Sequence, residues 1–262
     1  MMGVVLQFSS FELSYIMVLR FYLYAIVLLV RLSCGFQTAS AQEIDSSRYK
    51  IYRYYVDSIR TTLEYARFDS SLFLKEALFW DALFPSSASF RWSHFDSKAD
   101  FRNATFRKKG VRDAVDFEGA KFFSYATFIG AKFYSNTSFI ESEFYSYANF
   151  VGSTFSHIST FRGAFFDDRV KFDKSQFSSF ALFTEGHFDS LASFVGVNFD
   201  YEVDLNNALF ESNADFRRTS FKSKADINKV FSNLKLILIM LTLKLKCLLR
   251  KPILIRWLIL QV

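Results

Sequence analysis

The sequence predicts an all-β solenoid, a stack of short strands around a phenylalanine core, on the strength of three observations. Of its 262 residues, 35 are Phe against 13 Tyr and 3 Trp, a bias that ordinary globular packing does not require. The phenylalanines recur regularly along the chain, at steps that alternate between five and six positions. Only 2 Pro and 9 Gly occur, too few for a collagen-like chain or for the turns of a hairpin sandwich.

Each half of the repeat has an apolar centre with a small residue two positions before it. Thirty consecutive centres run from Phe68 to Ile227. All are Phe except Val111, Leu205 and Ile227, and the phase slips once, beside Lys109. Steps of five and six would spread apolar residues over every face of an α-helix, whereas in stacked strands both inward positions point to the axis. We therefore assign the aromatic centres to the core and none to ligand binding.

Ala-x-Phe triplets within the repeat resemble the Phe-centred form of the pentapeptide-repeat family. They stand at residues 99–101, 126–128, 148–150 and 214–216, and the resemblance covers about residues 66–230. It implies a right-handed, quadrilateral β-helix with four halves per coil, or about seven and a half coils and ~35 Å of stack. Family repeats are strictly five residues long, so the steps of five and six require two corners of each coil to absorb an extra residue.

Four segments are predicted along the chain. They are a signal peptide or N-terminal anchor (1–41), an N-terminal capping helix (42–66), the pentapeptide-repeat β-helix (67–231) and an apolar basic C-terminal tail (232–262). A solenoid exposes its core at both ends and needs caps. Apolar residues at helical intervals within 42–66 predict that the first cap is a short helix.

The first segment has the layout of a secretory signal peptide. Arg20 precedes an apolar run at 21–30, and small residues at 39–41 indicate cleavage after Ala41. An uncleaved anchor stays open, because the longer apolar stretch is only slightly short of the roughly 20 residues that span a membrane. A lipoprotein signal at Cys34 is a weaker alternative. Export to the periplasm or cell surface, with membrane association as a variant, is the expected location.

The basic charge of the protein belongs to its tail. Residues 68–230 hold 19 Lys and Arg against 21 Asp and Glu, while the tail holds six basic residues and no acid. The tail is expected either to cap the last coil or to lie on an anionic membrane surface as a basic amphipathic segment. Acids and bases alternate around the coils, so no nucleic-acid partner is expected.

No catalytic, cofactor-binding or metal-ligating residue is assigned, and no cofactor is expected. His94, His157 and His187 show no metal-ligand spacing from one another and take outward or corner positions, which predicts surface residues. No phosphate loop, nucleophile elbow or Cys–His pairing occurs. The acidic pairs Asp167–Asp168 and Asp113–Asp116 are typical of solvated corners.

These observations predict a non-enzymatic structural or protein-interaction solenoid that acts outside the cytoplasm. Its partner would be an unknown protein or glycan held on the outward side chains of one face. The alternative is a membrane-associated accessory protein, anchored by the N-terminal segment or by the basic tail at 232–262.

Overall fold

The computed structural model describes part of the chain, and that part is built from β-strands. The described residues are 50–52, 56–57, 61–64, 66–107, 114–226 and 231–232. Within these ranges no helix occurs, and so none that is long and apolar enough to cross a membrane. The predicted signal peptide or anchor (1–41) and the tail beyond residue 232 lie outside the described residues.

The strands form four parallel sheets, of which the largest has nine strands. This nine-stranded sheet holds β1 (Lys50–Tyr52), β4 (Ser71–Phe73), β8 (His94–Phe95), β12 (Lys121–Phe122), β16 (Glu143–Phe144), β20 (Phe165–Phe166), β24 (His187–Phe188), β28 (Leu209–Phe210) and β32 (Phe231–Ser232). The seven-stranded sheet holds β6 (Leu83–Phe84), β10 (Thr105–Phe106), β14 (Lys132–Phe133), β18 (Thr154–Phe155), β22 (Gln176–Phe177), β26 (Asn198–Phe199) and β30 (Ser220–Phe221).

Two eight-stranded sheets complete the solenoid. The β2 sheet holds β2 (Val56–Asp57), β5 (Ala77–Leu78), β9 (Ala99–Asp100), β13 (Ala126–Thr127), β17 (Ala148–Asn149), β21 (Val170–Lys171), β25 (Ala192–Ser193) and β29 (Ala214–Asp215). The β3 sheet holds β3 (Ala66–Arg67), β7 (Ala88–Ser89), β11 (Ala114–Asp116), β15 (Asn136–Ser138), β19 (Ser159–Thr160), β23 (Ala181–Leu182), β27 (Val203–Asp204) and β31 (Ala225–Asp226).

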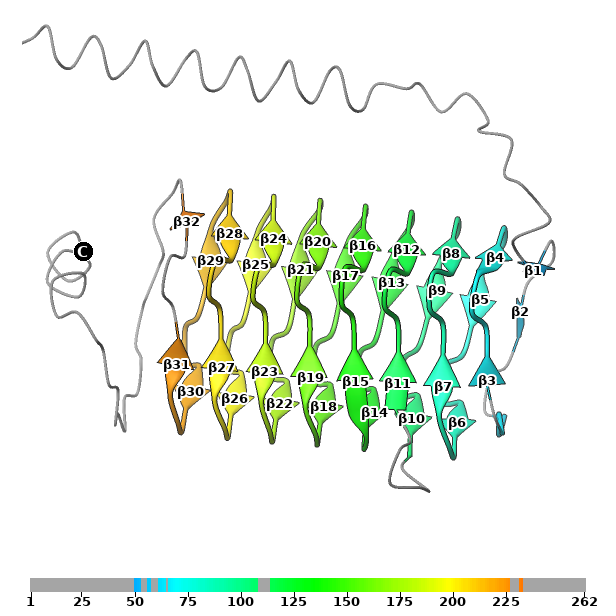
Figure 1. The fold of residues 1–262 in the computed structure, drawn as a ribbon, viewed down its shortest axis with the longest axis horizontal. Coiled ribbons are helices and arrows are strands. Elements are labelled where there is room, and N and C mark those ends of the chain that lie inside the picture. Colours follow the sequence, from blue (N-terminus) through cyan, green and yellow to red (C-terminus); the bar gives the residue numbers. More distant parts are fainter. Residues whose placement is uncertain are drawn as a thin grey trace, which may run out of the picture. The chain divides into compact units, whose positions relative to one another are not determined.

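Successive coils stack with equivalent residues directly above one another. Phe122 of β12 pairs with Phe144 of β16, and Phe144 pairs with Phe166 of β20, so the step along the chain is the same each time. Each coil therefore contributes one strand to each of the four sheets, and the strands of a sheet follow one another along the solenoid (Figure 1). The predicted fold, a four-sided parallel β-solenoid, is confirmed for the described residues.

The core consists of phenylalanine ladders and the small residues that precede them. Phe122 and Phe144 stack with ring centroids 4.6 Å apart, while Phe128 and Phe139 from facing sheets meet edge to face at 5.4 Å. All four side chains are fully buried, as are small residues such as Ala126. Burial of each Phe is worth about 1.5–3 kcal/mol before chain entropy is subtracted. The assignment of the aromatic centres to the core is thus confirmed for the described coils.

Where two successive centres are five residues apart, as Phe79 and Phe84 are, the chain between them forms a tight turn. After Phe79, the N–H of Ala82 donates to the Phe79 C=O at 3.1 Å, and Asp81 has a φ of 55°. A positive φ at the third residue is typical of a type II turn. Polar residues before the centre support the turn, as where Asp116 accepts from the N–H of Glu118 at 2.9 Å. The six-residue halves hold bends instead, so two corners of each coil do absorb the extra residue.

Two glycines at this turn position allow backbone strain to be distinguished from side-chain crowding. Gly119 and Gly152 have φ of 63° and 66°, where a side chain costs about 1–2 kcal/mol. An added Cβ at Gly119 would lie 2.1 Å from the Trp92 ring, whereas at Gly152 it meets nothing within 4 Å. We expect Gly119→Ala to lower the denaturation midpoint more than Gly152→Ala and to shift the tryptophan emission. Equal midpoints in a urea titration would show that Trp92 moves aside without cost.

The predicted N-terminal capping helix (42–66) is wrong where the structure describes that segment. Tyr52 of β1 pairs with Phe73, and Val56 of β2 pairs with Ala77, both in parallel. The first full coil leaves a row of backbone N–H and C=O groups to be paired, and the preceding strands supply the partners. The solenoid therefore begins before residue 67, and the helical spacing of the apolar residues was misleading.

The ladder has one centre fewer between Phe106 and Phe117 than the sequence predicts. Phe106 pairs with Phe84 of the preceding coil and with Phe133 of the following one, and the second step along the chain is the longer by five positions. Among the described residues, the next buried centre after Phe106 is Phe117. Val111, the predicted centre, lies outside the described residues. The five extra residues were mistaken for a half-repeat, because five residues is also the length of one.

Candidate functional site

The outward face of the nine-stranded sheet carries a row of rings that we call the aromatic row. Its members are His94, Phe123, Tyr145, Phe165 and His187. Phe123 and Tyr145 stack at 5.0 Å with an interplanar angle of 2°. Edge contacts join His94 to Phe123 at 6.0 Å, Tyr145 to Phe165 at 6.2 Å and Phe165 to His187 at 5.3 Å. Phe123 and Tyr145 remain 45% and 37% exposed, so the row presents apolar surface to solvent.

Charged groups fix the middle of the aromatic row. Lys121 and Glu143 form an ion pair at 3.0 Å between neighbouring coils. The hydroxyl of Tyr145 donates to the same Glu143 carboxylate. Burial, the Glu143 hydrogen bond and nearby negative charge raise the pKa of Tyr145, so the phenol stays protonated. The rings are thereby held in a defined geometry before any partner arrives.

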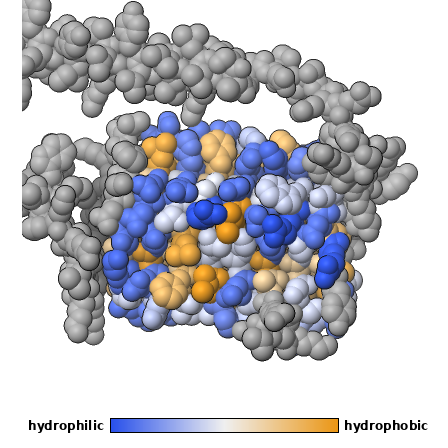
Figure 2. Space-filling model, viewed as in Figure 1, coloured by the Kyte–Doolittle hydropathy of each residue, from blue (hydrophilic) through white to orange (hydrophobic). Residues whose placement is uncertain are grey.

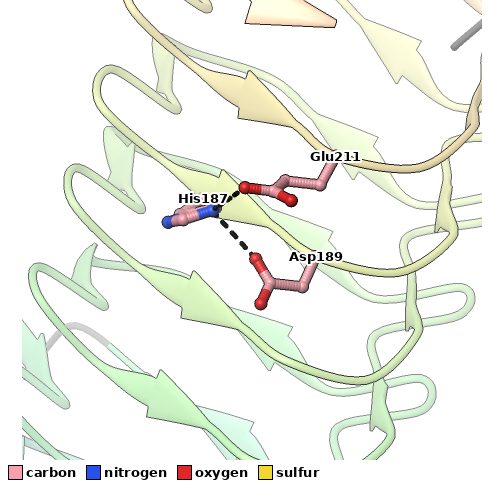
Figure 3. A group of neighbouring side chains, drawn as sticks. All are labelled: His187, Asp189 and Glu211. Carbon is pink, nitrogen blue, oxygen red and sulfur yellow. Dashed lines mark ion pairs between the residues drawn. The ribbon is translucent and has the colours of Figure 1, made fainter. Parts of the chain in front are cut away.

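At one end of the aromatic row, His187 meets two carboxylates. His187 belongs to β24, Asp189 follows that strand, and Glu211 takes the place equivalent to Asp189 one coil further on. The Nε2 atom of His187 lies 2.8 Å from Asp189 Oδ1 and 3.5 Å from Glu211 Oε1 (Figure 3). The hydrogen bond with Asp189 raises the pKa of His187 despite the opposing effect of burial.

The first histidine of the aromatic row stands in a similar sequence but in different surroundings. His94 and Asp96 flank a ladder Phe as His187 and Asp189 do, yet Phe123 occupies the place that corresponds to Glu211. Burial and the charge of Lys121 lower the pKa of His94, and burial raises that of Asp96. The two histidine sites of this face therefore differ in their third group.

His94 and His187 take outward strand positions and His157 lies in a bend, as predicted, although all three are half-buried. The convergence of His187 with Glu211 was missed. The sequence spacing could have predicted this contact, because His187 and Glu211 are separated by one coil plus two positions. Among the acidic pairs, Asp168 lies in a bend and contacts Arg169 at 3.9 Å, as a solvated corner does, whereas Asp116 ends strand β11 and pairs with Arg91 at 3.3 Å. Asp113 lies outside the described residues.

The surface that Figure 2 displays is mixed in polarity. In Figure 2, hydrophobic and hydrophilic residues alternate over the described solenoid. Other exposed aromatic side chains include Trp92, Tyr134 and Tyr201. Tyr201 meets Phe180 of the neighbouring coil at 4.6 Å, and Tyr125 stacks on Tyr147 at 5.4 Å. The aromatic row is longer than these pairs, since its five rings contact one another through successive coils, and this makes it the candidate binding surface.

The fold and its ladders define a class of protein, a parallel β-solenoid with four sheets around stacked phenylalanines. Residues 117–164 match the family model described as pentapeptide repeats (9 copies). The chain thus carries the pentapeptide repeats that its Ala-x-Phe triplets predict. No curated protein matches the chain.

Proposed function

We propose that this protein is a non-enzymatic interaction solenoid that acts outside the cytoplasm and binds a protein or glycan through the aromatic row. The observation that carries the proposal is the stacking of exposed Phe123 and Tyr145 beside the half-buried Phe165 and His187. Pentapeptide-repeat solenoids are typically structural or protein-interaction folds. Rigid aromatic side chains offer a large contact area at low entropic cost.

The geometry of the sheet supports this choice of surface. The parallel register places Phe123 and Tyr145 directly beside each other in successive coils, and the ion pair of Lys121 with Glu143 supplies polar groups next to them. Interfaces commonly combine an aromatic centre with a polar rim, and the centre provides most of the binding energy. A flat partner surface or a stacked sugar ring would fit such an arrangement.

The test is site-specific photocrosslinking in the protein's own host. A photoreactive phenylalanine analogue in place of Tyr145 should give a discrete crosslinked species. Tyr134 is the matched control, because it has a similar exposure of 42% and also follows a ladder Phe, but in the seven-stranded sheet. A crosslink from position 145 that is absent at 134 supports the proposal, whereas the same products at both positions, or none at 145, contradict it.

The location is tested separately. Mass spectrometry of the protein from soluble and membrane fractions should find a soluble form that begins at Gln42. An intact N-terminus that resists carbonate extraction would instead support the membrane-associated alternative, whatever the aromatic row binds.

A further inference from the structure

We propose that His187, Asp189 and Glu211 form a binding site for a divalent transition-metal ion on the outward face of the nine-stranded sheet. The three side chains come from two consecutive coils and converge on one point (Figure 3). One ligand atom from each lies within 4.8 Å of the other two. The site goes beyond the proposed interaction function, which does not require a metal.

The separations fit those of ligands around one ion. Zinc binds imidazole nitrogen and carboxylate oxygen at about 2.0–2.2 Å, which in a tetrahedral site places neighbouring ligand atoms about 3.3–3.6 Å apart. The distance from His187 Nε2 to Glu211 Oε1 is 3.5 Å, within this range, and the distance to Asp189 Oδ1 is 2.8 Å, below it. Small side-chain rotations would therefore suffice, with water completing the coordination.

The surroundings hold the ligands in place. The rings of Phe165 and His187 meet edge to face with centroids 5.3 Å apart. His187 Nε2 and Asp189 Oδ1 are both shielded from solvent. The parallel register of β24 with β28 sets the distance between the two coils. A site on rigid strands loses little entropy when an ion binds.

The ligand types select the class of ion. One imidazole with two carboxylates suits zinc and its neighbours in the first transition series, whereas calcium and magnesium prefer oxygen ligands alone. Zinc is therefore the ion with which to test the site.

The chain contains its own control in the other histidine site. His94 and Asp96 repeat the arrangement of His187 and Asp189, but the third position is Phe123, and Lys121 lies beside the histidine. No carboxylate takes the place of Glu211 there, and the nearby Glu143 is paired with Lys121 at 3.0 Å, so that site should not bind zinc.

Isothermal titration of the purified full-length protein with zinc chloride tests the site. We expect one binding event. His187→Gln and Glu211→Gln should each lower the zinc affinity by more than ~100-fold, because loss of a group that only supports a ligand already lowers metal affinity by about 10–100-fold. His94→Gln should bind as the parent does. Circular dichroism confirms that the variants fold.

Cobalt provides a second readout, because visible d–d bands should appear with the parent and with His94→Gln but not with His187→Gln. The proposal is overturned if the parent binds no zinc, if His187→Gln and Glu211→Gln bind as tightly as the parent, or if His94→Gln loses binding to the same extent.

Discussion

Replacing Phe139 with alanine should lower the free energy of unfolding by about 3–5 kcal/mol, the range for a buried Phe in a core. Phe139 stacks between Phe117 and Phe161 at centroid distances of 4.8 and 4.9 Å, and meets Phe128 and Phe150 edge to face at 5.4 Å. The truncation would remove a ring from the middle of a ladder and leave a cavity that the rigid neighbouring coils cannot close. Chemical denaturation followed by circular dichroism measures the loss.

The control for this prediction is Tyr134→Ala. Tyr134 has a comparable size and lies nearby in the sequence, but it is 42% exposed, whereas Phe139 is fully buried. Its removal should change stability by no more than about 0.5 kcal/mol. Similar denaturation midpoints for the two variants would mean that the phenylalanine ladder is not what stabilises the solenoid.

Removing the two cations that contact Asp100 should lower the free energy of unfolding by about 3–5 kcal/mol, as expected when a buried charge loses its partners. The carboxylate side chain is 1% exposed, and it contacts Lys98 at 2.8 Å and Arg102 at 2.7 Å. Arg102 approaches it with Nε as well, in a bidentate arrangement. The variant Lys98→Met with Arg102→Met leaves the charge buried without compensation.

The loss of stability in the double variant should become smaller as the pH falls. Burial alone would raise the pKa of Asp100, but the hydrogen bonds from Arg102 and Lys98 outweigh it, and the net pKa is lowered. The ion pairs therefore stabilise the fold above about pH 4, the ordinary range of an aspartate, and this contribution is lost as the pH falls through the lowered value. Denaturation at several pH values should show the parent and the double variant converging in acid.

Arg217→Met is the control for the Asp100 variant. Arg217 makes the same contact with Asp215, two positions before it, at 2.7 Å, but both groups are more exposed. Solvent screening should leave this substitution nearly neutral. An equally large loss at both places, or a gap that stays constant in acid, would contradict the assignment of the effect to burial.

The fold could be predicted in detail because one local rule is repeated along the chain. Phe at nearly every centre and a small or slender residue two positions before it suffice to define the inward positions, and residues such as Phe128 and Ala126 are buried as expected. The failures occurred where the rule ends or is interrupted. Before residue 66 the centres are no longer Phe, and between Phe106 and Phe117 an insertion has the length of a half-repeat.

The candidate site was harder to predict because it depends on neighbours across coils. His187 and Glu211 are far apart in the sequence, and only the exact length of a coil brings them together. The same holds for Phe123 and Tyr145, which are separated by one coil and stack face to face. Once the length of a coil is known, outward positions can be aligned in columns, and both features become visible in the sequence.

The five-residue insertion between Phe106 and Phe117 shows what determines the register of the solenoid. Phe106 still pairs with Phe133 in the next coil, although the chain between them is longer than the chain between Phe106 and Phe84. The alignment is therefore set by the stacked rings together with the backbone hydrogen bonds between coils, and not by the amount of chain at the corner. Corners of this kind are sites where new sequence can be acquired without rearranging the scaffold, so that surface diversity can evolve independently of the core.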